Sequence, residues 1–146
     1  MVFRLFIAGE PKAQQRPRFS ARTGHVKAYD PSESRDAKAL IGMMAREQMG
    51  DSPPMEGDLL LQLTVRRNPP QSWSNKKRKA LLGKGIRQKP DLDNYIKLVL
   101  DALNGVVFKD DKEVTVIIAR KLWTDRQAGT SITVTDVEYE EDFPQT

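Results

Sequence analysis

One amphipathic segment, PDLDNYIKLVLDALNG from Pro90 to Gly105, constrains the fold of this chain most. Its apolar residues recur at helical spacing, and its ends carry an acid after proline and an Asn-Gly pair. The positions expected to pack against the core are Leu92, Ile96, Val99, Leu100 and Leu103. The pattern therefore predicts a helix that starts near Asp91 and ends at Asn104.

The flanking segments carry strand patterns and helix patterns in turn. Strands are predicted over residues 3–9, 58–67, 112–123 and 130–139, and the last two are expected to form a hairpin. Helices are predicted from residue 32 or 34 to 49 and over residues 74–82. The basic loop between the first strand and the first helix suggests a short hairpin around Thr23 and Gly24. This order predicts a single α+β domain over residues 1–146, with a small mixed β-sheet packed against helices and residues 139–146 as a frayed polar tail.

Composition narrows the functional classes. The chain has no cysteine, which excludes disulfides and thiolate metal sites and favours a reducing compartment such as the cytoplasm. The apolar run at the start is too short for a signal peptide, and no window is long enough to span a membrane. No glycine pattern for nucleotide binding is present. We therefore expect a soluble protein without a nucleotide cofactor or a membrane partner.

The charges are segregated along the chain. No acid occurs in residues 11–29 or in residues 59–90, and both tracts are rich in Lys and Arg. Such tracts suit a polyanion, because each cation near a phosphate releases condensed counterions, although a merely solvated surface is the ordinary alternative. The candidates for contacts with a DNA backbone are Arg16, Arg18, Lys76, Lys77 and Arg78. Trp73 and Phe108 are candidates for base stacking or for the core.

Two pairs of acids flank the predicted helix. Asp91 and Asp93 stand at its start, Lys97 follows Asp93 by one turn, and Asp110 and Asp111 come after its end. Carboxylates that converge among basic tracts suit Mg²⁺ and phosphodiester hydrolysis. The ordinary alternative is that Asp91 caps the helix and Asp93 interacts with the helix dipole. An EF-hand is excluded because its glycine and its last glutamate are missing.

Taken together, these residues resemble the signature of RusA-type Holliday junction resolvases. The resemblance rests on Asp91-Leu92-Asp93-Asn94, Lys97, Leu100-Asp101-Ala102-Leu103 and Asp110-Asp111, and more weakly on Gly9-Glu10-Pro11 and Arg16-Pro17-Arg18. It implies an α+β fold, a homodimer, and Mg²⁺-supported paired nicks across four-way DNA junctions in recombination and repair.

The resemblance also implies roles for single residues. Asp91, Asp93 and Asp111 match the metal-binding and catalytic carboxylates, Lys97 matches an essential lysine, and Asp110 matches a supporting acid. Because the connection before Asp110 is one residue shorter than in the best-known relative, the choice between Asp110 and Asp111 as the main ligand stays open. Two other functions stay open as well, namely a non-catalytic basic DNA-binding module and a nuclease of other branched DNA.

Overall fold

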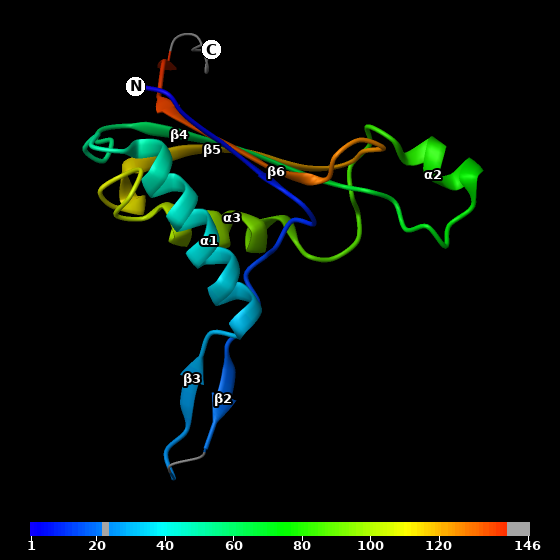
Figure 1. Ribbon diagram of the computed structural model, residues 1–146, viewed down its shortest axis with the longest axis horizontal. Helices are drawn as coiled ribbons and strands as arrows, with labels where there is room; N and C mark the ends of the chain where they lie inside the picture. The colour runs from blue at the N-terminus through cyan, green and yellow to red at the C-terminus, as the bar shows by residue number, and fades with distance from the viewer. Residues whose placement is uncertain (22–23, 140–146) are drawn as a thin grey trace.

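The structure, a computed structural model, describes residues 1–21 and 24–139 and has the predicted α+β composition (Figure 1). The strands are β1 (Phe3–Ala8), β2 (Arg18–Ser20), β3 (Lys27–Tyr29), β4 (Leu59–Arg67), β5 (Val114–Trp123) and β6 (Gly129–Asp136). The helices are α1 (Ser32–Met49), α2 (Asn75–Leu81) and α3 (Leu92–Leu103), with a 3-10 turn, η1, at Asp111–Glu113. Every helix predicted from the sequence is confirmed, while the proposed frayed tail lies outside the described residues except for Tyr139.

Local signals set the helix ends. Ser74 caps α2, and its side chain accepts a hydrogen bond from the backbone N–H of Lys77 at 3.2 Å. Gly50 ends α1 in a backbone conformation with a φ of 55°, which L side chains rarely adopt. The hairpin predicted in the basic loop is also present, because β2 and β3 pair antiparallel. Thr23, one of the two residues expected at its turn, lies outside the described residues.

The sheet order corrects one prediction. β5 and β6 do not form a hairpin, because β4 lies between them in the order β1-β6-β4-β5. β4 runs parallel to β5 and antiparallel to β6, and β6 runs antiparallel to β1. Burial explains the central place of β4, since Leu59, Leu61, Leu63 and Val65 are all at most 1% exposed and need neighbours on both sides. The connection from β5 to β6 crosses the end of β4, where Thr124 N donates to Arg67 O.

The core lies between one face of the sheet and two helices. α1 and α3 pack against each other and against that face (Figure 1). α3 buries Tyr95, Leu98, Val99, Ala102 and Leu103. The predicted apolar stripe is largely confirmed: Val99 and Leu103 are buried, and Ile96 and Leu100 are half-buried and pack against the core. Leu92 is only half-buried, and the stripe omitted the buried Tyr95, Leu98 and Ala102. Because α3 contacts both α1 and the sheet, its buried face is centred between these two neighbours.

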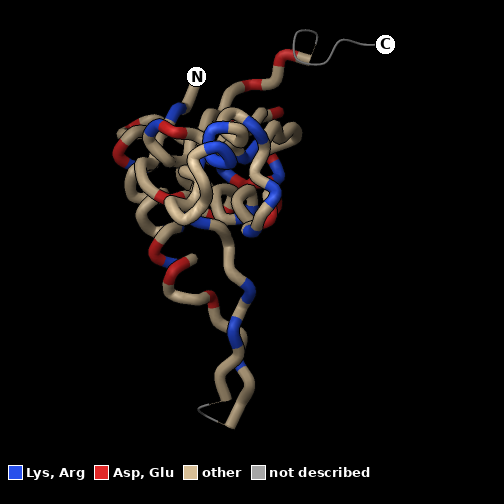
Figure 2. Tube along the Cα trace, turned by 90° about the vertical axis from the view of Figure 1, so that its right-hand side faces the viewer, with Lys and Arg blue, Asp and Glu red and all other residues tan. Residues whose placement is uncertain are grey.

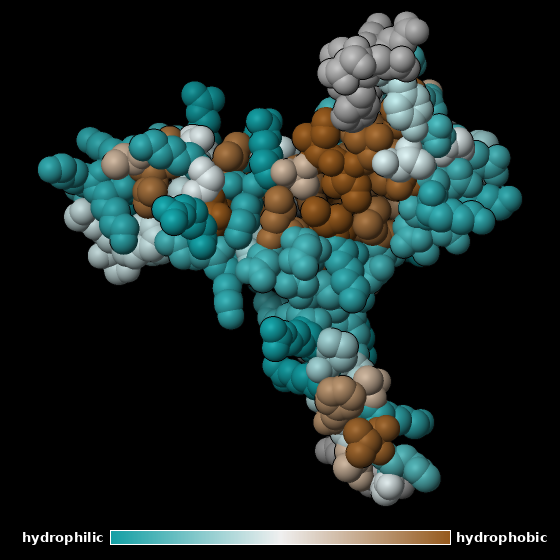
Figure 3. Space-filling model, turned by 180° about the vertical axis from the view of Figure 1, so that it is seen from behind, coloured by the Kyte–Doolittle hydropathy of each residue, from teal (hydrophilic) through white to brown (hydrophobic). Residues whose placement is uncertain are grey.

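The far edge of the sheet is apolar and exposed. β5 is an edge strand, and its Ile117 and Ile118 are 40% and 46% exposed. Figure 3 shows a hydrophobic patch on the face of the molecule seen from behind, where this edge lies. No helix within residues 1–21 and 24–139 is long and apolar enough to cross a membrane.

Candidate active site

The start of α3 carries the first acidic pair. Asp91 is the N-cap residue, and its carbonyl accepts from the backbone N–H of Asn94 at 3.1 Å, but its side chain makes no capping hydrogen bond. Asp93 lies in the first turn, and both carboxylates are exposed. Capping therefore accounts for the backbone at Asp91 and not for its carboxylate.

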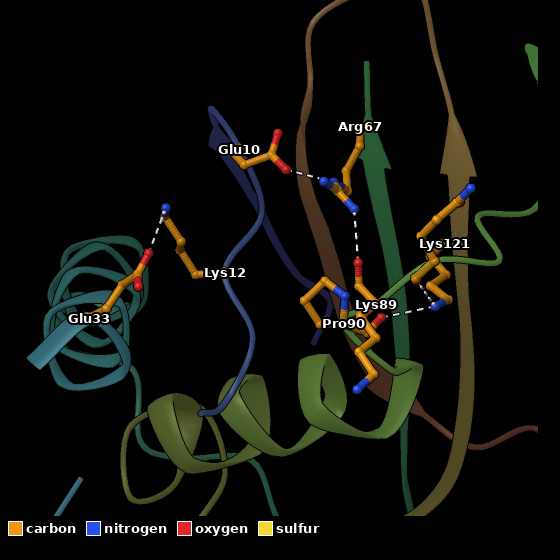
Figure 4. A network of polar contacts seen from close by, with 8 residues as sticks. Glu10, Lys12, Glu33, Arg67, Lys89, Pro90 and Lys121 are labelled. Atoms are coloured by element: carbon orange, nitrogen blue, oxygen red, sulfur yellow. Dashed lines mark hydrogen bonds and ion pairs between the residues drawn. The ribbon is translucent and has the colours of Figure 1, made fainter. Parts of the chain in front are cut away.

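Basic side chains from the sheet hold the segment that leads into α3 (Figure 4). Lys121 Nζ donates to the carbonyls of Gln88 and Pro90, each at 2.9 Å. Arg67 Nη1 donates to the carbonyl of Lys89 at 3.2 Å, and the Lys89-Pro90 peptide bond is cis. These contacts fix the chain directly before Asp91, and so they fix where its carboxylate lies.

The same arginine reaches the N-terminal loop. Arg67 Nε forms an ion pair with Glu10 Oε1 at 2.6 Å, at the point where the chain leaves β1 (Figure 4). The hydroxyl of Tyr95, on α3, is buried and has no hydrogen-bond partner within the described part of the chain. Burial raises its pKa, the Arg67 charge opposes that rise, and Glu10 adds to it. The start of α3 and the N-terminal loop are thus linked through one guanidinium.

A hollow of about 440 Å³ separates that loop from the helix start. Its polar lining includes Lys12, Arg16, Glu33, Lys89 and Asp91. Lys12 Nζ pairs with Glu33 Oε1 at 3.1 Å on one side, as Figure 4 shows. Arg16 and Asp91 are exposed at this hollow, so it offers a cation and a carboxylate to the same bound group.

One exposed side of α3 continues the polar site beyond Asp93. Asp93, Lys97 and Asp101 are spaced four residues apart, which places them along one face of the helix, and all three are exposed. Asp93 and Lys97 have the spacing for a local ion pair, but they form none in the structure. Asp101 lies 3.9 Å from Lys38 Nζ of α1. Asp101 was identified from the sequence only as part of the family signature and was not predicted as a site residue, although its spacing from Lys97 could have indicated that it shares the exposed face of α3.

The second acidic pair stands at η1, before β5. Asp110 Oδ1 accepts from the backbone N–H of Lys112 at 3.0 Å, and this bond lowers the pKa of the Asp110 carboxyl. A hydrogen bond with Asp110 raises the pKa of Asp111, and the negative charges of Asp110 and Asp101 add to that rise. Of the two carboxyl groups, Asp110 therefore loses its proton more readily than Asp111.

The carboxylate oxygens of the two acidic pairs are suitable ligands for a hard cation, but the side chains do not surround a common point. Asp111 is within electrostatic reach of Asp101, which lies ten residues, or about 15 Å of helix, after Asp91. No group of three or more His, Cys, Asp or Glu side chains close enough to hold a metal occurs in the described ranges. As placed, Asp91, Asp93 and Asp111 are not one preformed metal site.

The predicted DNA contacts lie on two separate projections (Figure 1). Arg18 belongs to the β2–β3 hairpin, which extends away from the helices, and Arg16 lies at its root. Lys76, Lys77 and Arg78 belong to α2, on the other projection. Figure 2 shows Lys and Arg along the hairpin and on the body above it. The helix that carries Asp91 and Asp93 lies between the two projections.

The two aromatic candidates differ. Phe108 is fully buried in the core, so it cannot stack on DNA. Trp73 is half-buried against Trp123, with ring centroids 5.5 Å apart, and Lys77 Nζ lies 4.0 Å from the centroid of the Trp73 ring. Trp73 therefore supports the lobe that carries α2.

Two comparisons relate the sequence of this chain to known proteins. Residues 8–135 match the sequence model of the family described as Endodeoxyribonuclease RusA. The chain is also similar to the uncharacterized protein YqaN of Bacillus subtilis (strain 168), with 37% identity over 123 residues, which cover 82% of this chain and 86% of that protein.

Proposed function

This chain belongs to the RusA endodeoxyribonuclease family, and we propose that it is a Mg²⁺-dependent endonuclease that resolves four-way DNA junctions by paired, symmetric nicks in recombination and repair. One observation carries the proposal for the catalytic helix. Asp91 takes the N-cap position, yet its carboxylate makes no capping bond and faces a polar hollow. A stability role for that acid is therefore insufficient, which favours a role toward a ligand.

We assign the metal to the acids on chemical grounds. Nucleases of this family depend on a divalent metal, and Asp91, Asp93 and Asp111 are its proposed ligands, with Asp110 in support. A bound cation of this kind supplies a Lewis acid that activates water and neutralises charge at phosphorus. The carboxylates are not closed around a common point, so their convergence on the cation is itself part of the proposal.

Lys97 has a separate proposed role. It is exposed, one turn after Asp93, and makes no ion pair with a described residue. An unpaired ammonium at this position can bind the scissile phosphate and stabilise the charge that develops on its oxygens. We therefore propose that Lys97 acts directly on the substrate.

Two further features support DNA and a second copy of the chain as partners. The cationic β2–β3 hairpin and α2 flank the start of α3, which suits a substrate with several duplex arms. Two symmetric nicks need two active sites related by a two-fold axis. The exposed Ile117 and Ile118 at the edge of β5 are the surface that we propose for the dimer contact.

Binding and nicking of a synthetic four-way junction, measured with and without Mg²⁺, test the proposal. Wild type and Asp93→Asn should both bind, and only wild type should nick. Asp51→Asn changes an exposed acid in the turn after α1 and serves as the matched control. Equal nicking by wild type and Asp93→Asn would contradict the catalytic assignment.

Two other results would favour the other candidate functions. Binding without nicking by either protein would favour a non-catalytic DNA-binding module. Faster nicking of flaps or three-way forks than of four-way junctions would favour a nuclease of other branched DNA.

A further inference from the structure

The β2–β3 hairpin, which we call the finger, is the part of the fold that packing explains least. Figure 1 shows it extending away from the sheet and from both large helices. Phe19 is 70% exposed, and Val26, just before β3, is 71% exposed. Large apolar side chains exposed together on a projection favour aggregation, and such groups commonly mark an interaction site, so a bound partner is the natural explanation.

The two faces of the finger differ in chemistry. Phe19 and Ala28 are register partners, so their side chains lie on one face of the ribbon. The residues of the other face are Arg18, Ser20, Lys27 and Tyr29. The finger therefore combines an apolar face, led by an aromatic ring, with a polar and cationic face.

Charge identifies the class of partner. Residues 11–29 contain cations and no acid, so the finger is complementary to a polyanion. A two-stranded β-ribbon fits the major groove of DNA, and an aromatic ring can stack on a base that is unpaired or poorly stacked. A junction centre provides such bases, whereas an intact linear duplex does not.

Hydrogen bonds anchor both roots of the finger to the large helices. Before β2, Gln14 N donates to Asn94 O of α3 at 2.9 Å, and Gln15 N donates to Ser34 Oγ of α1 at 3.0 Å. After β3, Asp30 accepts from Gln14 Nε2 at 2.8 Å, which ties the two roots together. The direction of the finger is thus set by the helices.

A lysine links the second root to the candidate active site. Lys38 Nζ forms an ion pair with Asp30 at 2.6 Å and lies 3.9 Å from Asp101 of α3. A hollow of about 260 Å³ at this root is lined by both Tyr29 and Lys97. DNA held by the finger would therefore pass beside the exposed face of α3.

We propose that the finger enters branched DNA at the branch point, where Phe19 stacks on an exposed base while Arg18 and Lys27 contact the backbone. This inference rests on the proposed function, since it takes branched DNA as the substrate. The finger then recognises the branch, and α3 acts on the strand beside it.

The test measures binding without cleavage, in the Asp93→Asn background and without added metal. Phe19→Ala is compared with Phe6→Ala, which removes another exposed phenylalanine, from β1 in the body. The substrates are a four-way junction and a linear duplex of equal length, and the junction carries 2-aminopurine at the branch point. Phe19→Trp is the conservative variant, and sedimentation reports the oligomeric state.

The proposal predicts that Phe19→Ala weakens junction binding about tenfold and removes the 2-aminopurine response, while duplex binding changes less than about twofold. Phe19→Trp should restore both signals, which also shows that the finger folds, and Phe6→Ala should behave as the parent protein.

Three results would overturn the proposal. Unchanged junction binding by Phe19→Ala excludes stacking, and equal losses on both substrates exclude recognition of the branch. Dissociation of a dimer by Phe19→Ala would identify a second copy of the chain as the partner of the finger. Failure of wild type to nick any DNA would refute the proposed function, yet the binding result for the finger would stand.

Discussion

Replacing Lys121 by methionine tests how the sheet positions the start of α3, which carries the proposed catalytic acids. Lys121 makes 2.9 Å bonds to the carbonyls of Gln88 and Pro90, directly before Asp91. A hydrogen bond from a charged donor contributes about 1.5–3 kcal/mol when it is buried. The contact to Gln88 is exposed and that to Pro90 is partly buried, so only the second counts nearly in full. We expect a loss of about 2 kcal/mol in unfolding free energy, or roughly 6 °C in Tm.

The effect on nicking should exceed the effect on stability. Freeing the segment before Asp91 moves its carboxylate, and a displacement of about 1 Å can cost up to roughly 100-fold in rate. Single-turnover nicking of a four-way junction at saturating protein should therefore slow between about 10- and 100-fold, with junction affinity unchanged within about twofold.

The neighbouring Arg120→Met is the control for Lys121→Met. Arg120 faces the opposite side of the sheet, where its Nε donates to Thr64 Oγ1 at 3.1 Å, so its loss should leave the nicking rate near that of wild type. Normal nicking by Lys121→Met, or an equal slowing by Arg120→Met, would refute the positioning argument.

Three further outcomes follow from other parts of the fold. Lys76→Ala should make the slope of log affinity against log salt shallower by about 0.9, measured by a salt titration of DNA binding, while Arg4→Ala should leave it unchanged. Partial burial opposes ionisation of Asp30, but its bonds from Lys38 and Gln14 hold its folded pKa below the ordinary value for aspartate. Its stabilising effect is therefore fully present above the unfolded pKa and is lost as the pH falls through the folded pKa. Asp30→Asn should therefore cost about 1 kcal/mol at pH 7 and almost nothing once the pH is below the folded pKa, as thermal unfolding at both pH values would show. Leu63→Ala should cost about 3 kcal/mol in urea unfolding, because Leu63 is 1% exposed in the central strand; a cost below about 1 kcal/mol would contradict its place in the core.

The sequence predicted the elements whose signals are local. Pro90 and Gly105 flank α3, and Ser74 caps α2, so the ends of both helices follow from neighbouring residues. The pairing of β5 with β6 was wrong because it depends on β4, a strand far away in the sequence that inserts between them. Adjacent strands joined by a short connection usually form a hairpin, and here the burial of β4 overrides that tendency.

In the candidate site, too, the local features were predictable from the sequence and the long-range contacts were not. The positions of Asp91 and Asp93 at the start of α3 were predictable, because a helix start is a local feature. The contacts of Lys121 and Arg67 were not, because they join side chains of the sheet to backbone carbonyls of a remote segment. The place of Asp111 near Asp101 likewise depends on how the connection after α3 folds back, which no spacing in the sequence determines.

Mapping of cleavage positions on a four-way junction shows whether this protein resolves junctions by paired nicks at a metal site on α3. Each strand of a synthetic junction is end-labelled in turn and incubated with the protein in Mg²⁺, and the products are separated on a denaturing gel. We expect nicks at symmetric positions in two opposed strands, which Asp93→Asn and removal of the metal should both abolish. Nicks that persist in Asp93→Asn, or that occur equally in a linear duplex of the same sequence, would contradict this expectation.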